Sequence, residues 1–130
     1  MRAEIVSGMA AKDELGRRGE DVAVEYLERK GLVVLSRNWR CREGEIDVVA
    51  TQRERDGTRL VVCEIKTRSG TRYGEPAEAV TGLKAQRIRR VTKAWLAAHH
   101  VAWCEIRFDV VAVLMRPGRP VTLEHYEAAF

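Results

Sequence analysis

The sequence has no long apolar run and no cysteine pattern of the kind that binds zinc or builds a disulfide framework. None of its apolar stretches approaches the ~20 residues that a membrane helix requires, and the N-terminal MRAEIVSGMAAKDELGRR lacks the apolar core of a secretory signal. We therefore expect a cytoplasmic protein that does not cross a membrane. The three cysteines are an odd number without a C-x-x-C motif, so we interpret them as small buried hydrophobic residues.

A strong excess of charge of one sign is also missing. The chain has 23 Lys and Arg against 19 Asp and Glu, which gives a net charge of +4. Arginines outnumber lysines, and the planar guanidinium suits phosphate oxygens, so a polyanionic partner such as nucleic acid is consistent with this composition. A solvated basic surface explains so modest an excess equally well. Charge alone therefore identifies no partner.

Internal repeats and low-complexity tracts are absent, and 130 residues suit one domain. We expect a flexible tail over residues 1–12 and a single domain over 13–130. Hydrophobic periodicity and turn signals predict these elements in chain order: a helix over 13–30, strands over 32–41, 46–50 and 60–67, a helix over 81–100 with Thr81 as its N-cap, one or two strands within 103–115, and a short edge strand at 121–126. This order predicts an α/β fold in which helices flank a mixed β-sheet.

Four charged residues interrupt the apolar strands of the stretch EGEIDVVATQRERDGTRLVVCEIKTRSG (43–70). Because strand side chains alternate, Glu45 and Asp47 share one face of their strand. Glu64 and Lys66 likewise share one face of the following strand. The pattern places three carboxylates and an ammonium group on neighbouring strands.

The dipeptide Asp56-Gly57 predicts a two-residue hairpin loop between these strands. With that loop, Asp47 lies opposite Lys66 and is the diagonal neighbour of Glu64, at about 7–8 Å between backbone positions. Carboxylates at this spacing can reach one ion held between them.

A divalent cation is one explanation for these clustered acids, and a structural ion-pair network is the other. Like charges in a partly buried site repel, and a cation such as Mg²⁺, which prefers oxygen ligands, removes the conflict. Water bound to the metal beside Lys66 would be a nucleophile for a phosphodiester. Buried charge clusters are not all catalytic, however, so both interpretations stay open.

Five motifs occur in an order that resembles a known family: GRRGED (16–21), GEIDVVA (44–50), CEIKTR (63–68), YGEPAEAVTGLKAQRI (73–88) and RFDVVAV (107–113). Together they resemble the YraN-like family of small bacterial proteins, which is similar to the Holliday-junction resolvases of the PD-(D/E)-x-K nucleases. The resemblance implies a restriction-endonuclease-like fold of the order α-β-β-β-α-β. It also implies an Mg²⁺- or Mn²⁺-dependent endonuclease that acts on DNA as a homodimer.

The resemblance assigns a role to each of the central residues. Asp47 and Glu64 would be metal ligands, with the carbonyl of Ile65 as a further ligand. Lys66 would position or activate the attacking water. Glu20, on the first helix, would hold a water at the metal. Ile46 stands where the family motif has proline.

Residues around this centre have weaker assignments. Glu45 is either an outer acid of the site or a partner of Arg42 or Arg68. Lys84 falls on the sheet-facing stripe of the second helix, where it would extend out to solvent. The resemblance implies the alternative, in which Lys84 or Gln86 contacts a phosphate.

The loop after the third predicted strand offers further contacts for a nucleic acid. Arg68, Arg72 and Tyr73 are arranged to clamp a phosphate backbone or stack on a base, unless this is simply a solvated loop.

Two further groups are interpreted as structural. We expect Trp39 and Trp95 in the core and Asp109 in support of the sheet or the first helix. His99 and His100 have no acidic or cysteine neighbours at ligand spacing, so we do not assign them to a metal.

A non-catalytic nucleic-acid-binding or adaptor module on a nuclease scaffold remains the alternative function.

Overall fold

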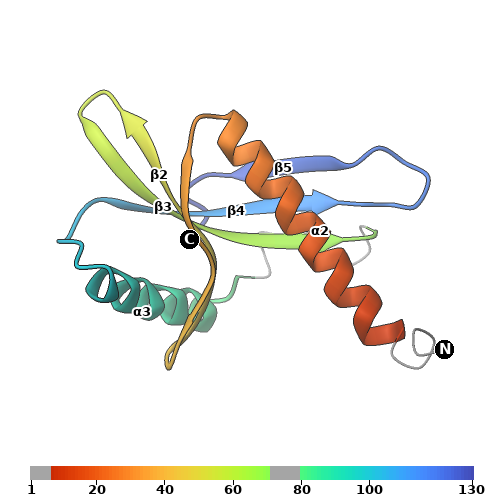
Figure 1. Cartoon of the computed structure of the whole chain (residues 1–130), viewed down its shortest axis with the longest axis horizontal. Coiled ribbons are helices and arrows are strands. Elements are labelled where there is room, and N and C mark those ends of the chain that lie inside the picture. Colours follow the sequence, from red (N-terminus) through yellow and green to blue (C-terminus); the bar gives the residue numbers. More distant parts are fainter. Residues whose placement is uncertain (1–6, 71–79) are drawn as a thin grey trace.

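The computed structural model describes residues 7–70 and 80–130 and shows a five-stranded mixed sheet flanked by two helices (Figure 1). The elements in chain order are α2 (Ser7–Arg29), β1 (Val33–Cys41), β2 (Gly44–Glu54), β3 (Gly57–Arg68), α3 (Gly82–Ala98), β4 (Ile106–Leu114) and β5 (Thr122–Tyr126). The strand order is β1-β2-β3-β4-β5, and only β3 and β4 run parallel. This is the predicted α/β fold, in the arrangement expected of a restriction-endonuclease-like domain.

The helix α3 makes the crossover that parallel strands require, because it joins β3 to β4. Thr81 caps it as predicted: its side chain accepts a hydrogen bond from the backbone N–H of Lys84 at 3.2 Å. Within the described residues, no helix is both long and apolar enough to cross a membrane.

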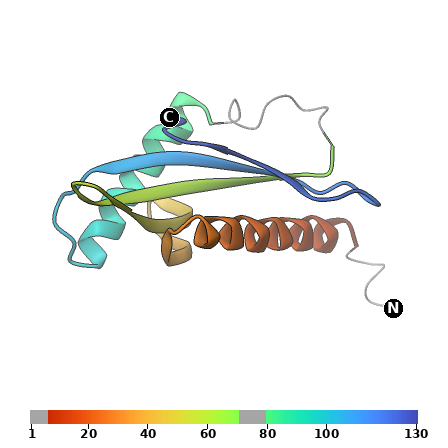
Figure 2. The same cartoon turned by 90° about the horizontal axis from the view of Figure 1, so that it is seen from above.

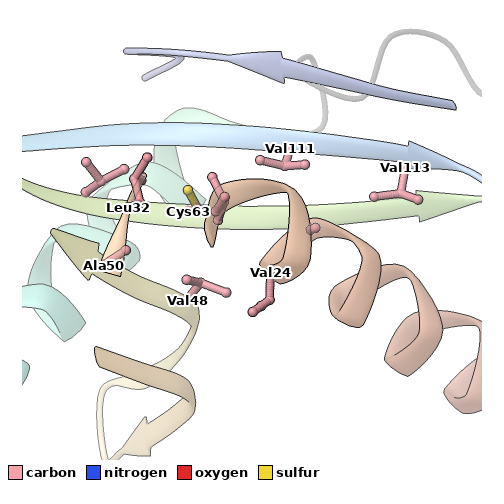
Figure 3. Packing of buried hydrophobic residues seen from close by; sticks show 10 residues of the cluster. Val24, Leu32, Val48, Ala50, Cys63, Val111 and Val113 are labelled. Carbon is pink, nitrogen blue, oxygen red and sulfur yellow. The ribbon is translucent and has the colours of Figure 1, made fainter. Parts of the chain in front are cut away.

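Each helix covers its own face of the sheet, and the alternation of β3 supplies both cores. Cys63 points into the core under α2, to which the helix contributes Val24 (Figure 3). Val61 and Leu27 belong to the same cluster. Figure 2 shows α2 running alongside the long strands of the sheet. The intervening residues of β3, such as Val62, pack against α3, where Trp95 is 2% exposed. Trp95 is thus a core residue, as expected.

Three elements are longer than the sequence pattern predicts, and one of them is β3, which spans Gly57–Arg68 instead of 60–67. Helix α2 starts at Ser7, so residues 7–12 of the expected tail belong to the helix, while residues 1–6 lie outside the described part. Strand β2 extends to Glu54, because Thr51 to Glu54 continue the ladder with β3.

The hairpin between β2 and β3 has a different register from the predicted one. The loop residues are Arg55 and Asp56, and Gly57 pairs with Glu54. Gly57 has a φ of +132°, so glycine is used just after the loop rather than within it. The predicted pairing is therefore wrong by two positions, although the faces of the strands are unchanged because the side-chain period is two.

Close approach between α2 and β3 depends on Gly19. A Cβ atom at this position would lie 2.0 Å from Oγ1 of Thr67, so any larger residue would push the helix away. Gly16, one turn earlier in α2, has no such role, because a Cβ atom placed there would meet no other described atom within 4 Å. Of these two glycines, Gly19 alone brings the neighbouring Glu20 against the sheet.

Candidate metal centre

The strands β2 and β3 separate in the middle of the sheet, and the candidate site lies where they part. Their ladder ends at the pair Val48↔Cys63, whereas β3 remains paired with β4 through its last residue. Beyond this point the backbone N–H of Ile65 donates to Oδ2 of Asp47 at 2.8 Å. A side-chain carboxylate thus takes the place of a strand carbonyl.

Asp47 and Glu64 are neighbours across this gap. Continuing the observed register by one position places Asp47 opposite Glu64, and not opposite Lys66 as predicted. Glu64 is 5% exposed, and its Oε2 has no hydrogen-bond partner among the described residues. A buried carboxylate oxygen without a partner is costly, so this atom calls for a cation or a proton.

Both carboxyl groups resist ionisation. Burial, followed by the charge of Asp47, raises the pKa of Glu64 to about 7, although the nearby lysines oppose the shift. Burial also raises the pKa of Asp47, against the hydrogen bond from Ile65. Burial and mutual repulsion disfavour the charged forms of both acids. A bound cation would stabilise these charged forms.

Two lysines complete the charge cluster. Burial and the neighbouring Lys84 together lower the pKa of Lys66 to about 8. Nζ of Lys84 lies 3.7 Å from Oε1 of Glu64. The amine of Lys66 is therefore partly neutral near pH 8, which allows it to accept a proton.

Two hollows open on either side of this centre, and Asp47 and Ile65 line both of them. The α2-side hollow, about 660 Å³, is also lined by Arg17, Glu20 and Arg40. The α3-side hollow, about 450 Å³, is also lined by Glu45, Glu64, Lys66, Lys84 and Arg87. The centre therefore lies between two polar recesses that both carry cationic side chains.

Glu20 is fixed in the α2-side hollow. Its Oε2 accepts hydrogen bonds from Nε of Arg37 at 2.8 Å and from Nδ2 of Asn38 at 2.9 Å. Glu20 is 8% exposed, so β1 neutralises a buried acid on α2. The structure brings Glu20 and Asp47 to one recess, while Glu64 and Lys66 face the other.

Some of the predicted outer residues lie close to the centre and others do not. Glu45 lines the α3-side hollow, and its Oε2 accepts a hydrogen bond from Nε of Arg40 rather than from either of the two expected arginines. Gln86 is exposed on α3 and lines neither of the two hollows. Arg68 ends β3, where its carbonyl accepts from the N–H of Met115 at 2.8 Å. Tyr73 and Arg72 lie outside the described residues.

Ile65 lies at the centre through its backbone. Its N–H points to Asp47, and the N–H and carbonyl of one strand residue point to the same side. We therefore expect the carbonyl oxygen, which the family resemblance makes a metal ligand, to face the gap as well.

A second cluster of polar residues, under α2, was missed by sequence reasoning. Ligand atoms of Cys63, Asp109 and His125 lie within 4.8 Å of one another. Asp109 is already saturated: Arg107 donates to both of its oxygens at 2.9 Å, and Nε2 of His125 donates to Oδ2 at 2.7 Å. Burial and the charge of Asp109 raise the pKa of Cys63, so its sulfur stays a thiol. The hydrogen bonds of this cluster make it an ion-pair network and not a metal site. No local sequence motif predicts it, because β4 and β5 contribute separate residues.

The centre at Asp47 and Glu64 offers hard oxygen ligands, a partly neutral amine and flanking cations. Carboxylate oxygens are the ligands that Mg²⁺ and Mn²⁺ accept, and the unpartnered Oε2 of Glu64 gives such an ion a place. The residues present thus fit a divalent cation.

Comparison with known proteins gives one consistent result. The chain matches the uncharacterised protein family UPF0102 over residues 19–113, a range that includes every residue of the centre. A UPF0102 protein of Frankia alni is 57% identical over 122 residues, covering 94% of this chain and 98% of that protein. Relatives from Kineococcus radiotolerans, 53% identical over 88% of this chain and 92% of the relative, and from Nocardia farcinica, 45% identical over 98% of both, bear the same family name. The chain therefore belongs to the UPF0102, or YraN-like, family.

Proposed function

We propose that this protein is a divalent-metal-dependent endonuclease that hydrolyses phosphodiester bonds in DNA. The observation that carries the proposal is the buried pair Asp47 and Glu64, whose raised pKa values and unpartnered Oε2 call for a cation. The similarity of the YraN-like family to the Holliday-junction resolvases of the PD-(D/E)-x-K nucleases also supports it.

Asp47 and Glu64 would hold the ion, with the carbonyl of Ile65 as a third donor. Mg²⁺ or Mn²⁺ at this position would supply positive charge to the phosphate and lower the pKa of a coordinated water. Ile65 already fixes the Asp47 side chain through the backbone N–H. That hydrogen bond leaves Oδ1 of Asp47 available, so the protein orients the ligand before any ion is bound.

Lys66 would move the proton. Because burial and Lys84 lower the pKa of Lys66, part of its population is neutral at mildly alkaline pH. Nζ of Lys66 can then accept a proton from the attacking water and, once charged, stabilise the phosphate oxygens in the transition state. Glu20, held by Arg37 and Asn38 at the α2-side hollow, would orient a water there.

The two hollows suggest how a nucleic acid would approach. Arg17 and Arg40 line one, and Lys84 and Arg87 line the other, so cations lie on both sides of the acids. This is the distribution that a phosphate backbone crossing the site requires. Branched DNA is the proposed substrate, and because both of its strands must be cut, the acting species is proposed to be a homodimer.

Cleavage assays on branched, flap and single-stranded DNA test the proposal. With Mn²⁺ or Mg²⁺, the wild-type protein should cut at least one substrate, and Asp47→Asn and Lys66→Met should each lower the rate by about 10³-fold or more. Asp56→Asn and Lys93→Met are matched controls, since both residues are exposed and lie outside the centre. Cleavage that persists in Asp47→Asn or in excess chelator contradicts the mechanism.

A second candidate function is a non-catalytic nucleic-acid-binding or adaptor module. The ion pair between Lys84 and Glu64 favours it, because this pair partly neutralises the acids without a metal. In that case Asp47→Asn would leave DNA affinity unchanged or improve it, since it removes negative charge. Calorimetry with Mn²⁺ separates the two functions: only the nuclease should show binding heat that disappears in Asp47→Asn.

A further inference from the structure

Lys84 forms an ion pair with Glu64, and among the described residues it is the one cation that does so. Nζ of Lys84 lies 3.7 Å from Oε1 of Glu64, beyond hydrogen-bond distance. The Lys84 side chain is 33% exposed, whereas that of Glu64 is 7% exposed. The ion pair is therefore loose, and one of its partners can leave into solvent without unfolding anything.

The position of Lys84 in α3 makes this pair unusual. Lys84 belongs to the first helical turn, which contains no acidic residue, and the first turn is the positive end of the helix dipole. A lysine there is electrostatically unfavourable unless an anion lies nearby. Glu64 is that anion in this structure, and a substrate phosphate in the α3-side hollow would serve as well.

Glu64 presents two oxygens that are used differently. Oε1 has the loose contact with Lys84, while the buried Oε2 has no hydrogen-bond partner in the described part of the chain. The lysine therefore neutralises Glu64 incompletely. A divalent cation beside Oε2 and Asp47 would repel the ammonium group of Lys84, since the two cations would lie within a few ångströms of each other in a partly buried site.

We propose that Lys84 is an exchangeable counter-ion: it pairs with Glu64 when no metal is bound, and it moves to the substrate phosphate when a divalent cation takes its place. This inference rests on the proposed nuclease function and extends it. Metal binding and phosphate binding would be coupled through one side chain, because a bound ion would free Lys84 from Glu64 and the freed Lys84 would contact the phosphate.

Three consequences follow for the Lys84→Met variant, which keeps the aliphatic stem and removes the charge. Without a competing ammonium group, Mn²⁺ should bind about three- to tenfold more tightly. The rise in melting temperature on adding Mn²⁺ should be larger than in the wild type. Affinity for non-cleavable DNA in the presence of Ca²⁺ should fall by about three- to tenfold, since a phosphate contact is lost.

Calorimetric titration of Mn²⁺ into four proteins tests the exchange: wild type, Lys84→Met, Lys93→Met and Asp47→Asn. Lys93 is exposed on the same helix, so Lys93→Met controls for the loss of one positive charge. The exchange predicts tighter binding in Lys84→Met alone. Equal affinity in Lys84→Met and Lys93→Met overturns the exchange while leaving the metal site intact, whereas absence of Mn²⁺ binding in the wild type overturns the proposed function and the exchange together.

Discussion

Asp109 and Glu64 are two buried acids on adjacent parallel strands, and they differ in their hydrogen-bond partners and in the direction in which their pKa values are shifted. Asp109 pairs with Cys63 in register and lies on the α2 face of the sheet, while Glu64, one position further along β3, lies on the α3 face. Asp109 is 0% exposed and Glu64 is 5% exposed, so burial does not distinguish them. The difference lies in their partners.

Every oxygen of Asp109 is satisfied by several donors. Oδ1 accepts from Arg107 and from the backbone N–H of Ala128, and Oδ2 accepts from Arg107 and His125. His125 in turn lies 2.9 Å from the hydroxyl of Tyr26 on α2. Burial alone would raise the pKa of Asp109, but these hydrogen bonds outweigh it and hold the pKa below its usual 3.8. This acid joins β4, β5 and α2.

Glu64 has one loose ion pair and one oxygen without a hydrogen-bond partner among the described residues, and its pKa is raised. Asp109 already has all its donors, whereas Glu64 would gain a partner for Oε2 only when the proposed cation binds. The two faces of one sheet thus bury charge in two ways, one acid with a complete set of donors and one without.

The largest expected effect is on the structural side. Asp109→Asn keeps the shape but removes the charge that pairs with Arg107, whose side chain is 10% exposed, so the free energy of unfolding should fall by about 3–5 kcal/mol. Urea unfolding at pH 7 measures it. The comparison breaks if Asp109→Asn costs less than about 1 kcal/mol, because the network would then contribute little.

The dependence of stability on pH should differ in sign between the two acids. A folded pKa below 3.8 means that Asp109 contributes stability that is present above pH 3.8 and lost as the pH falls through its folded pKa. A folded pKa raised from 4.5 to about 7 means that Glu64 contributes stability below pH 4.5 that is lost as the pH rises towards 7. The free energy of unfolding, measured between pH 3 and pH 8 in excess chelator, should therefore fall at both ends of this range: below pH 3.8 because of Asp109, and from pH 4.5 towards pH 7 because of Glu64. A flat profile between pH 4.5 and 7 contradicts the assignment for Glu64.

The smallest effect is expected for Glu64→Gln. Because the folded protein disfavours the charged form of Glu64, the amide should change the free energy of unfolding at pH 7 by less than about 1 kcal/mol in either direction. The same substitution should abolish Mn²⁺ binding, since it removes a charged ligand. A loss of stability as large as that of Asp109→Asn would make Glu64 a structural acid and would favour the ion-pair interpretation.

The sequence predicts the cluster around Glu64 better than the cluster around Asp109, for a physical reason. Glu64 and Lys66 are two residues apart on one strand, so alternation alone places them together. Asp109 and His125 meet only because β4 pairs with β5, and no local rule joins positions so far apart. The expectation that Asp109 supports the sheet or the first helix is confirmed, but His125 was not identified as its partner.

The register of the central hairpin shows what a turn motif leaves open. Asp56-Gly57 correctly indicates a tight turn, but it does not say whether glycine lies within the loop or just after it. The structure places Gly57 after the loop. As a result, the residue opposite Asp47 is Glu64 and not Lys66. The prediction that these residues converge survives because a shift of two positions preserves the face.

Anomalous scattering from a crystal grown with Mn²⁺ tests the central claim most directly. The account predicts a single strong peak between the side chains of Asp47 and Glu64, adjacent to Oε2, which disappears in Asp47→Asn crystals. A peak at Cys63, Asp109 and His125 instead, or none between Asp47 and Glu64 at saturating Mn²⁺, would contradict it.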